Sequence, residues 1–412
     1  MLETKVCIVG AGPGGAAAAL QLAKLDIECI IVDKATFPRD KVCGDGVSGK
    51  AVYALQNIDK DMAQRLHQFP DKLGSWGVTF VSPGRLNVDI AYKPTYDRNI
   101  DTPAGYVCKR LHFDNFMVDE LRRRPEIRLF EGVAIEQYEL QEGGYLVSDA
   151  QRNFTVKAEL LIIANGAHSS FTKKVANIRM QPSRYAAGVR TYYKNVKGLH
   201  AENFIELHFL SHLLPGYLWI FPLPNGEANV GMDMMSEAII RKKINLKKLL
   251  VDTLSNDPVF KERFKDAEIM GDIEGYGLPL GSKKRKLSGY RYMLVGDAAY
   301  LVDPFTGEGI GNALYSGRIA AQQAAASLKS NDYSAKALSG YDQQIYRILG
   351  PELQLGKRLQ RLVKFPWLFN VLMRIGTNNK QLKELISSMF YEVDLRKKLA
   401  QPSFYFKLFF NK

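Results

Sequence analysis

Short apolar runs separated by turns and amphipathic stretches recur along the chain. The runs at 5–9, 28–32, 160–163 and 292–295 are mostly apolar, which is typical of strands buried on both faces of a parallel sheet. An alanine-rich run at 16–25 follows the first of them and predicts a helix. The chain therefore opens with strand, turn and helix, and the later runs predict further strands of the same sheet.

The turn after the first predicted strand is rich in glycine and reads Gly10-Ala11-Gly12-Pro13-Gly14-Gly15. Gly10 permits a tight turn, Gly12 lets the backbone approach a pyrophosphate, and Gly15 lets the helix pack on the strand. Asp33 ends the second strand about 20 residues later, where a carboxylate would bind ribose hydroxyls. The pattern predicts a dinucleotide site without separating FAD from NAD. The candidate contacts here are Gly10, Gly12, Pro13, Gly14, Gly15, Asp33 and Lys34.

A second glycine-rich segment follows the strand at 292–295. It begins Gly296-Asp297-Ala298-Ala299 and continues through 303–311 into a predicted helix. This segment resembles the second FAD fingerprint of the hydroxylase and geranylgeranyl reductase superfamily. In that superfamily the matching aspartate binds the ribityl chain, and the helix start lies at the flavin pyrimidine, where its N–H groups favour the reduced, negatively charged ring. The resemblance implies FAD as the cofactor, with contacts from Gly296, Asp297, Gly307, Gly309 and Ile310.

Arg110, within 108–114, matches a family arginine that lies near the FAD, and a surface arginine at a helix start is the alternative. Residues 165–170 resemble the middle fingerprint of the hydroxylases, but Asn165 stands where those enzymes have aspartate. This departure weighs against NADPH use in the hydroxylase manner.

Two further motifs favour the reductase branch. Residues 41–46, Lys-Val-Cys-Gly-Asp-Gly, resemble the KxCGGG element of geranylgeranyl reductases, with Asp45 at the central glycine as in the CGDG version of bacterial members, menaquinone prenyl reductases included. Residues 217–222 resemble the YxWxFP element that lines the prenyl pocket of that family. The alternation in 217–221 places Tyr217, Trp219 and Phe221 on one face of a strand, as a pocket wall or as plain core.

The resemblance to the geranylgeranyl reductase family implies an FAD-dependent reductase that saturates carbon–carbon double bonds of a geranylgeranyl-type or prenylquinone lipid. Cys43 is the candidate gate or proton relay, and the faces of Tyr217 and Trp219 would stabilise positive charge on the substrate. Phe221 and Pro222 would line the substrate pocket. A monooxygenase or halogenase of the same fold, and an electron-transfer flavoprotein acting on quinone, are the alternatives.

The resemblance also implies a mixed α/β fold, consistent with a length of 412 residues, at which one core usually splits. We expect a discontinuous Rossmann-like FAD-binding domain from 1–75, 105–180 and 275–330. An antiparallel-sheet substrate domain, interwoven with it, would come from 76–104 and 181–274. The remaining 331–412 would form a C-terminal helical region.

Cysteine spacing, apolar run length and net charge limit the classes of partner and the location that we expect. The four cysteines lack metal-ligand spacing, so we expect no metal site and no disulfide framework, and a cytoplasmic location. We find no secretory signal and no apolar run of the roughly 18 residues that a membrane span needs. A net charge of +13 suits an anionic membrane surface or a ferredoxin-like electron donor, with NAD(P)H as the other donor, whereas dispersed basic residues disfavour nucleic acid.

The helix-rich region after 341 is basic and amphipathic, and ends in an aromatic tail of Phe404, Tyr405, Phe406, Phe409 and Phe410. This pattern predicts either peripheral membrane contact on the inner face or a solvated helical surface.

Overall fold

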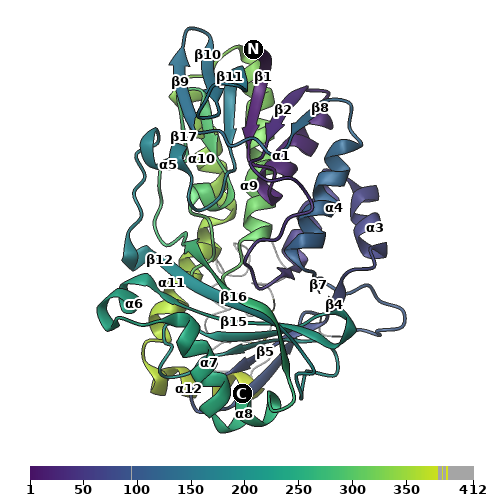
Figure 1. The fold of residues 1–412 in the computed structure, drawn as a ribbon, viewed down its shortest axis with the longest axis vertical. Helices are drawn as coiled ribbons and strands as arrows, with labels where there is room; N and C mark the ends of the chain where they lie inside the picture. Colours follow the sequence, from purple (N-terminus) through teal and green to yellow (C-terminus); the bar gives the residue numbers. More distant parts are fainter. Residues whose placement is uncertain (94, 379–382, 384–386, 388–412) are drawn as a thin grey trace.

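Two sheets at opposite ends of the molecule organise the chain (Figure 1). The structure is a computed structural model that describes residues 1–93, 95–378, 383 and 387. Strands of the first sheet come from 2–163 and 288–294, and those of the second sheet from 77–91 and 185–279. The chain therefore crosses between the two sheets several times.

The first sheet has eight strands in the described part of the chain, with a core order of β17-β18-β11-β1-β2-β8. β1 pairs in parallel with β2 and β11, β11 with β18, and β2 with β8, whereas β10 and β9 extend from β11 as an antiparallel hairpin. The predicted apolar runs form the centre of this sheet. Their side chains are buried on both faces, as expected for central strands of a parallel sheet. The bounds are β1 (Leu2–Val9), β2 (Cys29–Val32), β8 (Ile127–Phe130), β9 (Gln137–Gln141), β10 (Gly144–Ser148), β11 (Thr155–Ile163), β17 (Ser288–Gly289) and β18 (Tyr292–Leu294).

Two helices that start at the predicted glycine-rich turns pack directly on each other. They are α1 (Pro13–Ala23) and α9 (Ile310–Ser330). A Cβ on Gly317 of α9 would lie 2.0 Å from the Gly14 carbonyl oxygen of α1, and a Cβ on Gly14 would lie 3.3 Å from the Ala313 carbonyl oxygen. Glycine and alanine at this crossing are therefore what allow the two backbones to meet.

The second sheet has seven strands among the described residues, ordered β16-β12-β15-β14-β13-β5-β6. Its pairs are antiparallel except for β13 with β5. Its bounds are β5 (Gly77–Val81), β6 (Asn87–Ala91), β12 (Tyr185–Lys194), β13 (Ile205–His208), β14 (Leu218–Pro222), β15 (Glu227–Met235) and β16 (Glu268–Pro279). A small sheet of β3 (Gly46–Val47), β7 (Gly105–Val107) and β4 (Leu73–Ser75) lies beside it.

The second sheet buries a different cluster on each face. Leu218 and Ile220 pack with Leu250 and Phe260 of α7 and α8, whereas Trp219 belongs to the cluster on the opposite face, which includes α12. The remaining helices are α2 (Gly49–Ile58), α3 (Lys60–Gln68), α4 (Arg110–Arg122), α5 (Ser170–Lys174), α6 (Ser236–Lys242), α7 (Leu246–Asn256), α8 (Pro258–Arg263), α10 (Ala335–Ile348), α11 (Gly350–Leu362) and α12 (Pro366–Asn378).

The mixed α/β fold class is confirmed, and the division into domains at the expected boundaries stays a prediction. Within residues 1–93, 95–378, 383 and 387, the structure contains no helix that is both long and apolar enough to span a membrane. The aromatic tail at 404–410 lies outside the described residues.

Candidate functional site

A cavity of about 650 Å³ is lined by residues of both large sheets and of the loops between them. It reaches from the start of α1 to the aromatic side chains of β14. Two predicted site residues do not line it. Gly15 lies behind the turn, where a Cβ would be 1.8 Å from the Gly10 carbonyl oxygen, and Pro222 is buried at the end of β14. The predicted residues that line the cavity are Gly10, Gly12, Pro13, Gly14, Asp33, Lys34, Cys43, Arg110, Tyr217, Trp219, Phe221, Gly296, Asp297, Gly307, Gly309 and Ile310.

At one end of the cavity, the turn between β1 and α1 exposes its backbone. Gly10 has φ of +106°, which favours glycine, and a Cβ there would lie 2.5 Å from the Ala164 carbonyl oxygen. Asp33 at the end of β2 accepts hydrogen bonds from the backbone N–H groups of Ala11 (2.7 Å) and Ala35 (2.8 Å). Its carboxylate is thereby fixed beside the turn.

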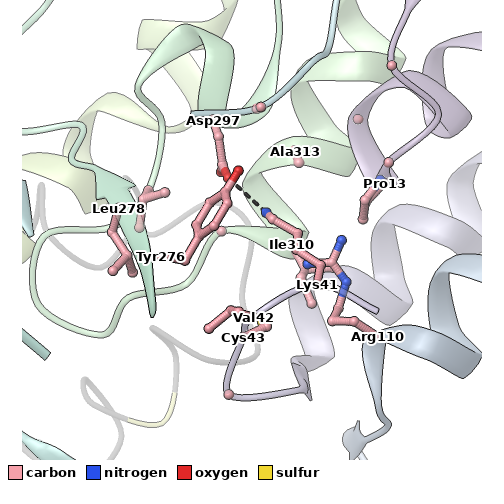
Figure 2. Close-up of a pocket in the computed structure, with 18 of the residues that line it drawn as sticks. Pro13, Lys41, Val42, Cys43, Arg110, Tyr276, Leu278, Asp297, Ile310 and Ala313 are labelled. Carbon is pink, nitrogen blue, oxygen red and sulfur yellow. Dashed lines mark hydrogen bonds and ion pairs between the residues drawn. The ribbon is translucent and has the colours of Figure 1, made fainter. Parts of the chain in front are cut away.

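The loop at 41–46 supplies a lysine that contacts the second fingerprint. Lys41 Nζ lies 3.0 Å from Asp297 Oδ2 and 4.9 Å from the centre of the Tyr276 ring (Figure 2). Burial is the largest single influence and would lower the pKa of Lys41, but the Asp297 carboxylate, together with Tyr276 and Cys43, more than offsets it, so the pKa is raised. Lys41 therefore stays a cation at this wall of the cavity.

Arg110 is buried, not on the surface, and begins α4 (Figure 2). Its guanidinium donates two hydrogen bonds to Asp114, at 2.6 and 2.7 Å, and Asp114 also pairs with Arg39 at 2.6 Å. The bidentate pair fixes the arginine toward the loop that carries Cys43.

Cys43 lies in the cavity wall, half-buried. Burial raises the pKa of its thiol, and Arg110 only partly opposes this effect. The thiol is therefore neutral at physiological pH and a weaker acid than a free cysteine. The next residue brings the loop against the aromatic side chains, since a Cβ on Gly44 would lie 3.0 Å from Cε2 of Phe221.

Asp45 adopts a φ of +64°, a conformation that favours glycine, and is buried behind the cavity lining. Its Oδ2 accepts hydrogen bonds from Tyr192 Oη (2.8 Å) and Asn229 Nδ2 (2.7 Å), and its Oδ1 accepts one from the Arg110 N–H (3.2 Å). Burial raises the pKa of Asp45 to about 6, against the opposing charge of Arg190. The aspartate thus ties the loop to the second sheet, which a glycine at this position could not do.

Asn229 extends this connection to the aromatic motif. Its Nδ2 also donates to the Cys43 carbonyl oxygen (2.8 Å), and its Oδ1 accepts the Trp219 indole N–H (2.8 Å). One buried amide therefore holds both the Cys43 loop and the tryptophan ring.

Two rows of residues from neighbouring segments of the second sheet, at 217–221 and 229–233, meet on this side of the cavity. Tyr217, Trp219 and Phe221 make an aromatic row, with ring centres 6.1 and 6.5 Å apart. Trp219 pairs with Gly231 of β15, and a Cβ on Gly231 would lie 2.3 Å from Cζ2 of Trp219, so the missing side chain makes room for the indole. Tyr217 Oη donates to the Thr306 carbonyl oxygen (2.8 Å) and so joins this wall to the second fingerprint.

Asp233 ends the second row and was missed at the sequence level. Its Oδ1 accepts a hydrogen bond from the Tyr217 N–H (3.0 Å), and the residue lines the cavity. The signal that could have found it is the period of two, because Asn229, Gly231 and Asp233 follow one another on the same face of β15. Lys41 and Glu308 also lie in the cavity wall; they belong to the motifs at 41–46 and 303–311, which predicted no role for either side chain.

The cavity suits FAD on the chemistry of its donors. Gly12 and Gly309 are the N-caps of α1 and α9; neither helix has a side-chain cap at that position, and both glycines line the cavity. The α1 start would hold the diphosphate and the α9 start the pyrimidine edge of the ring, because helix N-termini bind negative charge.

Comparisons with known proteins agree with this geometry. An FAD binding domain family matches residues 3–210. The menaquinone reductase of Mycobacterium tuberculosis is 30% identical over 331 residues, 77% of this chain and 75% of the relative. Digeranylgeranylglycerophospholipid reductase 3 of Methanosphaera stadtmanae is 30% identical over 375 residues, 88% of this chain and 85% of the relative.

Among solved structures, a geranylgeranyl bacteriochlorophyll reductase-like protein of Thermoplasma acidophilum has the same fold. Its TM-score is 0.80 at 22% identity, over 97% of this chain and 99% of that one. Together with the two fingerprints, these matches establish FAD as the cofactor. The chain belongs to the geranylgeranyl reductase family of FAD-dependent oxidoreductases.

Proposed function

We propose that this enzyme saturates carbon–carbon double bonds in the prenyl chain of a lipid or a prenylquinone. The observation that carries the proposal is the shared cavity. Its lining includes both glycine-rich fingerprints, the Cys43 loop and the aromatic row of Tyr217, Trp219 and Phe221. An apolar chain that lies along the aromatic row would therefore reach the cofactor.

The protein's part in this reaction is to bind, orient and stabilise. Bound FAD, once reduced, supplies the hydride. An isolated alkene accepts hydride poorly, so a proton must reach the less substituted carbon as the hydride arrives, and positive charge then develops on the more substituted carbon. The faces of Tyr217 and Trp219 would stabilise that charge by about 0.5–2 kcal/mol per ring where water is excluded. Both rings are fixed, one by Thr306 and the other by Asn229, so they need not reorganise during the reaction.

The decisive experiment is anaerobic. The FAD-loaded enzyme is reduced with dithionite, which removes dependence on the natural donor, whether NAD(P)H or a ferredoxin-like protein. Geranylgeranyl diphosphate or menaquinone is then added, and flavin absorbance is followed together with the mass of the substrate. We expect flavin reoxidation with a gain of two mass units per double bond reduced.

Other outcomes identify other activities. Reoxidation by menaquinone without a mass gain would indicate a quinone oxidoreductase. Flavin that stays reduced until oxygen enters would indicate a monooxygenase. Trp219→Leu should slow the reaction with geranylgeranyl diphosphate by roughly 2- to 30-fold, since about 0.5–2 kcal/mol is lost and about 1.4 kcal/mol corresponds to a factor of ten. Tyr53→Leu, at an exposed aromatic residue of α2 outside the cavity, is the matched control.

We also propose that α12 rests on an anionic membrane surface, where a prenyl lipid would be found. Trp367, Val371 and Ile375 follow one another at a spacing of four residues and are 68%, 44% and 43% exposed. Exposed Arg361 and Lys364 precede them. Aromatic and aliphatic side chains beside basic ones are typical of helices that lie in a membrane interface.

Sedimentation with phosphatidylglycerol vesicles tests this contact. Trp367→Ser with Val371→Ser should lower the bound fraction, whereas Tyr53→Ser, an exposed aromatic on α2, should not. Equal binding by all three proteins would refute the contact.

A further inference from the structure

Saturating an alkene adds a hydride to one carbon and a proton to the other, so the proposed function leaves a proton donor to be identified. The inference below rests on that proposed function. The donor must line the cavity and carry a proton at neutral pH. That proton must not already be donated to another group in a hydrogen bond.

Three of the cavity's acids fail this test. Lys41 is held as a cation by Asp297. Burial raises the pKa of the Cys43 thiol, which makes it a poor acid. Burial also raises the pKa of Tyr217 well above its usual range, and its hydroxyl proton is already donated to the Thr306 carbonyl oxygen.

Glu308 is a stronger candidate but is bound at the start of α9. Its Oε1 accepts the Gly311 N–H at 2.5 Å. Burial raises the pKa of Glu308, while Lys50 and the Gly311 N–H favour its ionised form. Its carboxylate is therefore engaged by a backbone N–H in the first turn of α9.

Asp233 differs from these four groups in its hydrogen bonding and in its protonation. Asp233 lines the cavity, and the bond from the Tyr217 N–H to Oδ1 is the one hydrogen bond that its carboxyl accepts within the described residues, so Oδ2 is not engaged there. Burial raises the pKa of Asp233 to about 7, with only that N–H opposing it. Its carboxyl is therefore substantially protonated near neutral pH.

The neighbours of Asp233 carry no positive charge in the part of the chain that the structure describes. The titratable groups beside it are Tyr217, directly before β14, and Asp303, in the turn after η3 (Gly296–Ala299). The strands β12 and β16 and the helix α11 bring uncharged residues, namely Ala186, Gly188, Leu278 and Gln360.

We propose that Asp233 is the proton donor of the reduction. Its O–H bond breaks as the proton passes to the alkene carbon that does not receive the hydride, and the O–H bonding pair stays on the carboxylate. The two electrons that reduce the alkene come with the hydride from reduced FAD. Water returns a proton to Asp233 after the product leaves. The donor stands beside Tyr217, so proton delivery and charge stabilisation occur at the same end of the aromatic row.

Asp233→Asn tests the assignment, because the amide oxygen can still accept the Tyr217 N–H. Single-turnover reoxidation of the prereduced variant by geranylgeranyl diphosphate should be about 100-fold slower or more, the usual contribution of a general acid. FAD retention and reoxidation by oxygen should not change. Asp272→Asn, exposed on β16, is the matched control. The wild-type rate should fall as pH rises through 7, and the variant should lose this dependence.

A second measurement does not depend on turnover. Infrared spectra of the oxidised wild type should contain a protonated-carboxyl band that titrates near pH 7 and is absent from Asp233→Asn. An active wild type with an equally active variant would overturn the donor assignment alone. A large loss in Glu308→Gln with none in Asp233→Asn would overturn it in favour of Glu308. A wild type that reduces no prenyl substrate overturns the proposed function, and the assignment with it.

Discussion

Replacing Asp233 with asparagine should stabilise the protein, and the gain should depend on pH. Burial raises the pKa of Asp233 from an ordinary 3.8 to about 7, and the side chain is 9% exposed. A rise of this size corresponds to about 4 kcal/mol of penalty for the ionised form in the folded state. Asparagine has nearly the same shape, keeps the acceptor for the Tyr217 N–H and never ionises.

The direction in which stability changes with pH follows from proton binding to Asp233. Below pH 4 the carboxyl is protonated both folded and unfolded, so it adds no pH-dependent term. Between pH 4 and 7 the folded chain keeps the proton that the unfolded chain has released, so the wild type loses stability as pH rises. Above pH 7 the penalty is constant. The advantage of Asp233→Asn should therefore be near zero at pH 4, grow through pH 7 and level off at about 4 kcal/mol.

Urea unfolding of the two FAD-loaded proteins between pH 4.5 and 8.5 measures this difference, with circular dichroism and flavin fluorescence as probes. The slope of free energy against urea should be equal for both proteins, so that midpoints compare stability. A gain that is the same at every pH, or a loss that grows with pH, would refute the reasoning about the buried carboxyl. The combination expected here, higher stability with lower activity, is typical of catalytic groups held in unfavourable surroundings.

Three further substitutions test other contacts. Asn229→Leu leaves the Trp219 indole N–H and the Cys43 carbonyl oxygen without this partner and removes one of the two hydrogen bonds to Asp45 Oδ2, so urea unfolding should show a loss of about 3–5 kcal/mol. Lys50→Met removes the cation that lies 2.5 Å from Glu352, and both side chains are buried. The free energy of unfolding in urea should fall by about 3–5 kcal/mol. The double variant Lys50→Met with Glu352→Leu should regain most of that loss. Gly231→Ala places a Cβ against the Trp219 ring and should raise KM for the prenyl substrate with FAD retained; an unchanged KM would mean that the ring does not touch substrate.

The parts of the site that could be predicted from sequence are those encoded by local spacing. The turn at Gly10 to Gly15 and the start of α9 are short segments whose glycines have a backbone role, so their positions follow from neighbours in the chain. The aromatic row follows from the period of two along β14. Its placement opposite the Cys43 loop was implied by family resemblance, not by spacing.

What could not be predicted are contacts between distant segments. Asp45 and Asn229 are 184 positions apart, and Lys50 and Glu352 are 302 apart. No periodicity connects such pairs, because they meet only when both sheets are in place. The acidity of Asp233 is a similar case, since it depends on burial and on the lack of a nearby cation, and neither can be read from the residues beside it in the chain.

The close crossing of α1 and α9 fixes the distance between the two ends of the cofactor site. One helix starts where the diphosphate would lie and the other where the ring would lie, and Gly14 meets Gly317 with no side chain between them. The separation of the two anion-binding ends therefore cannot drift unless this contact opens. A larger residue at either glycine would push the two helix starts apart. A substitution far from the ring would therefore weaken the fit of the whole dinucleotide.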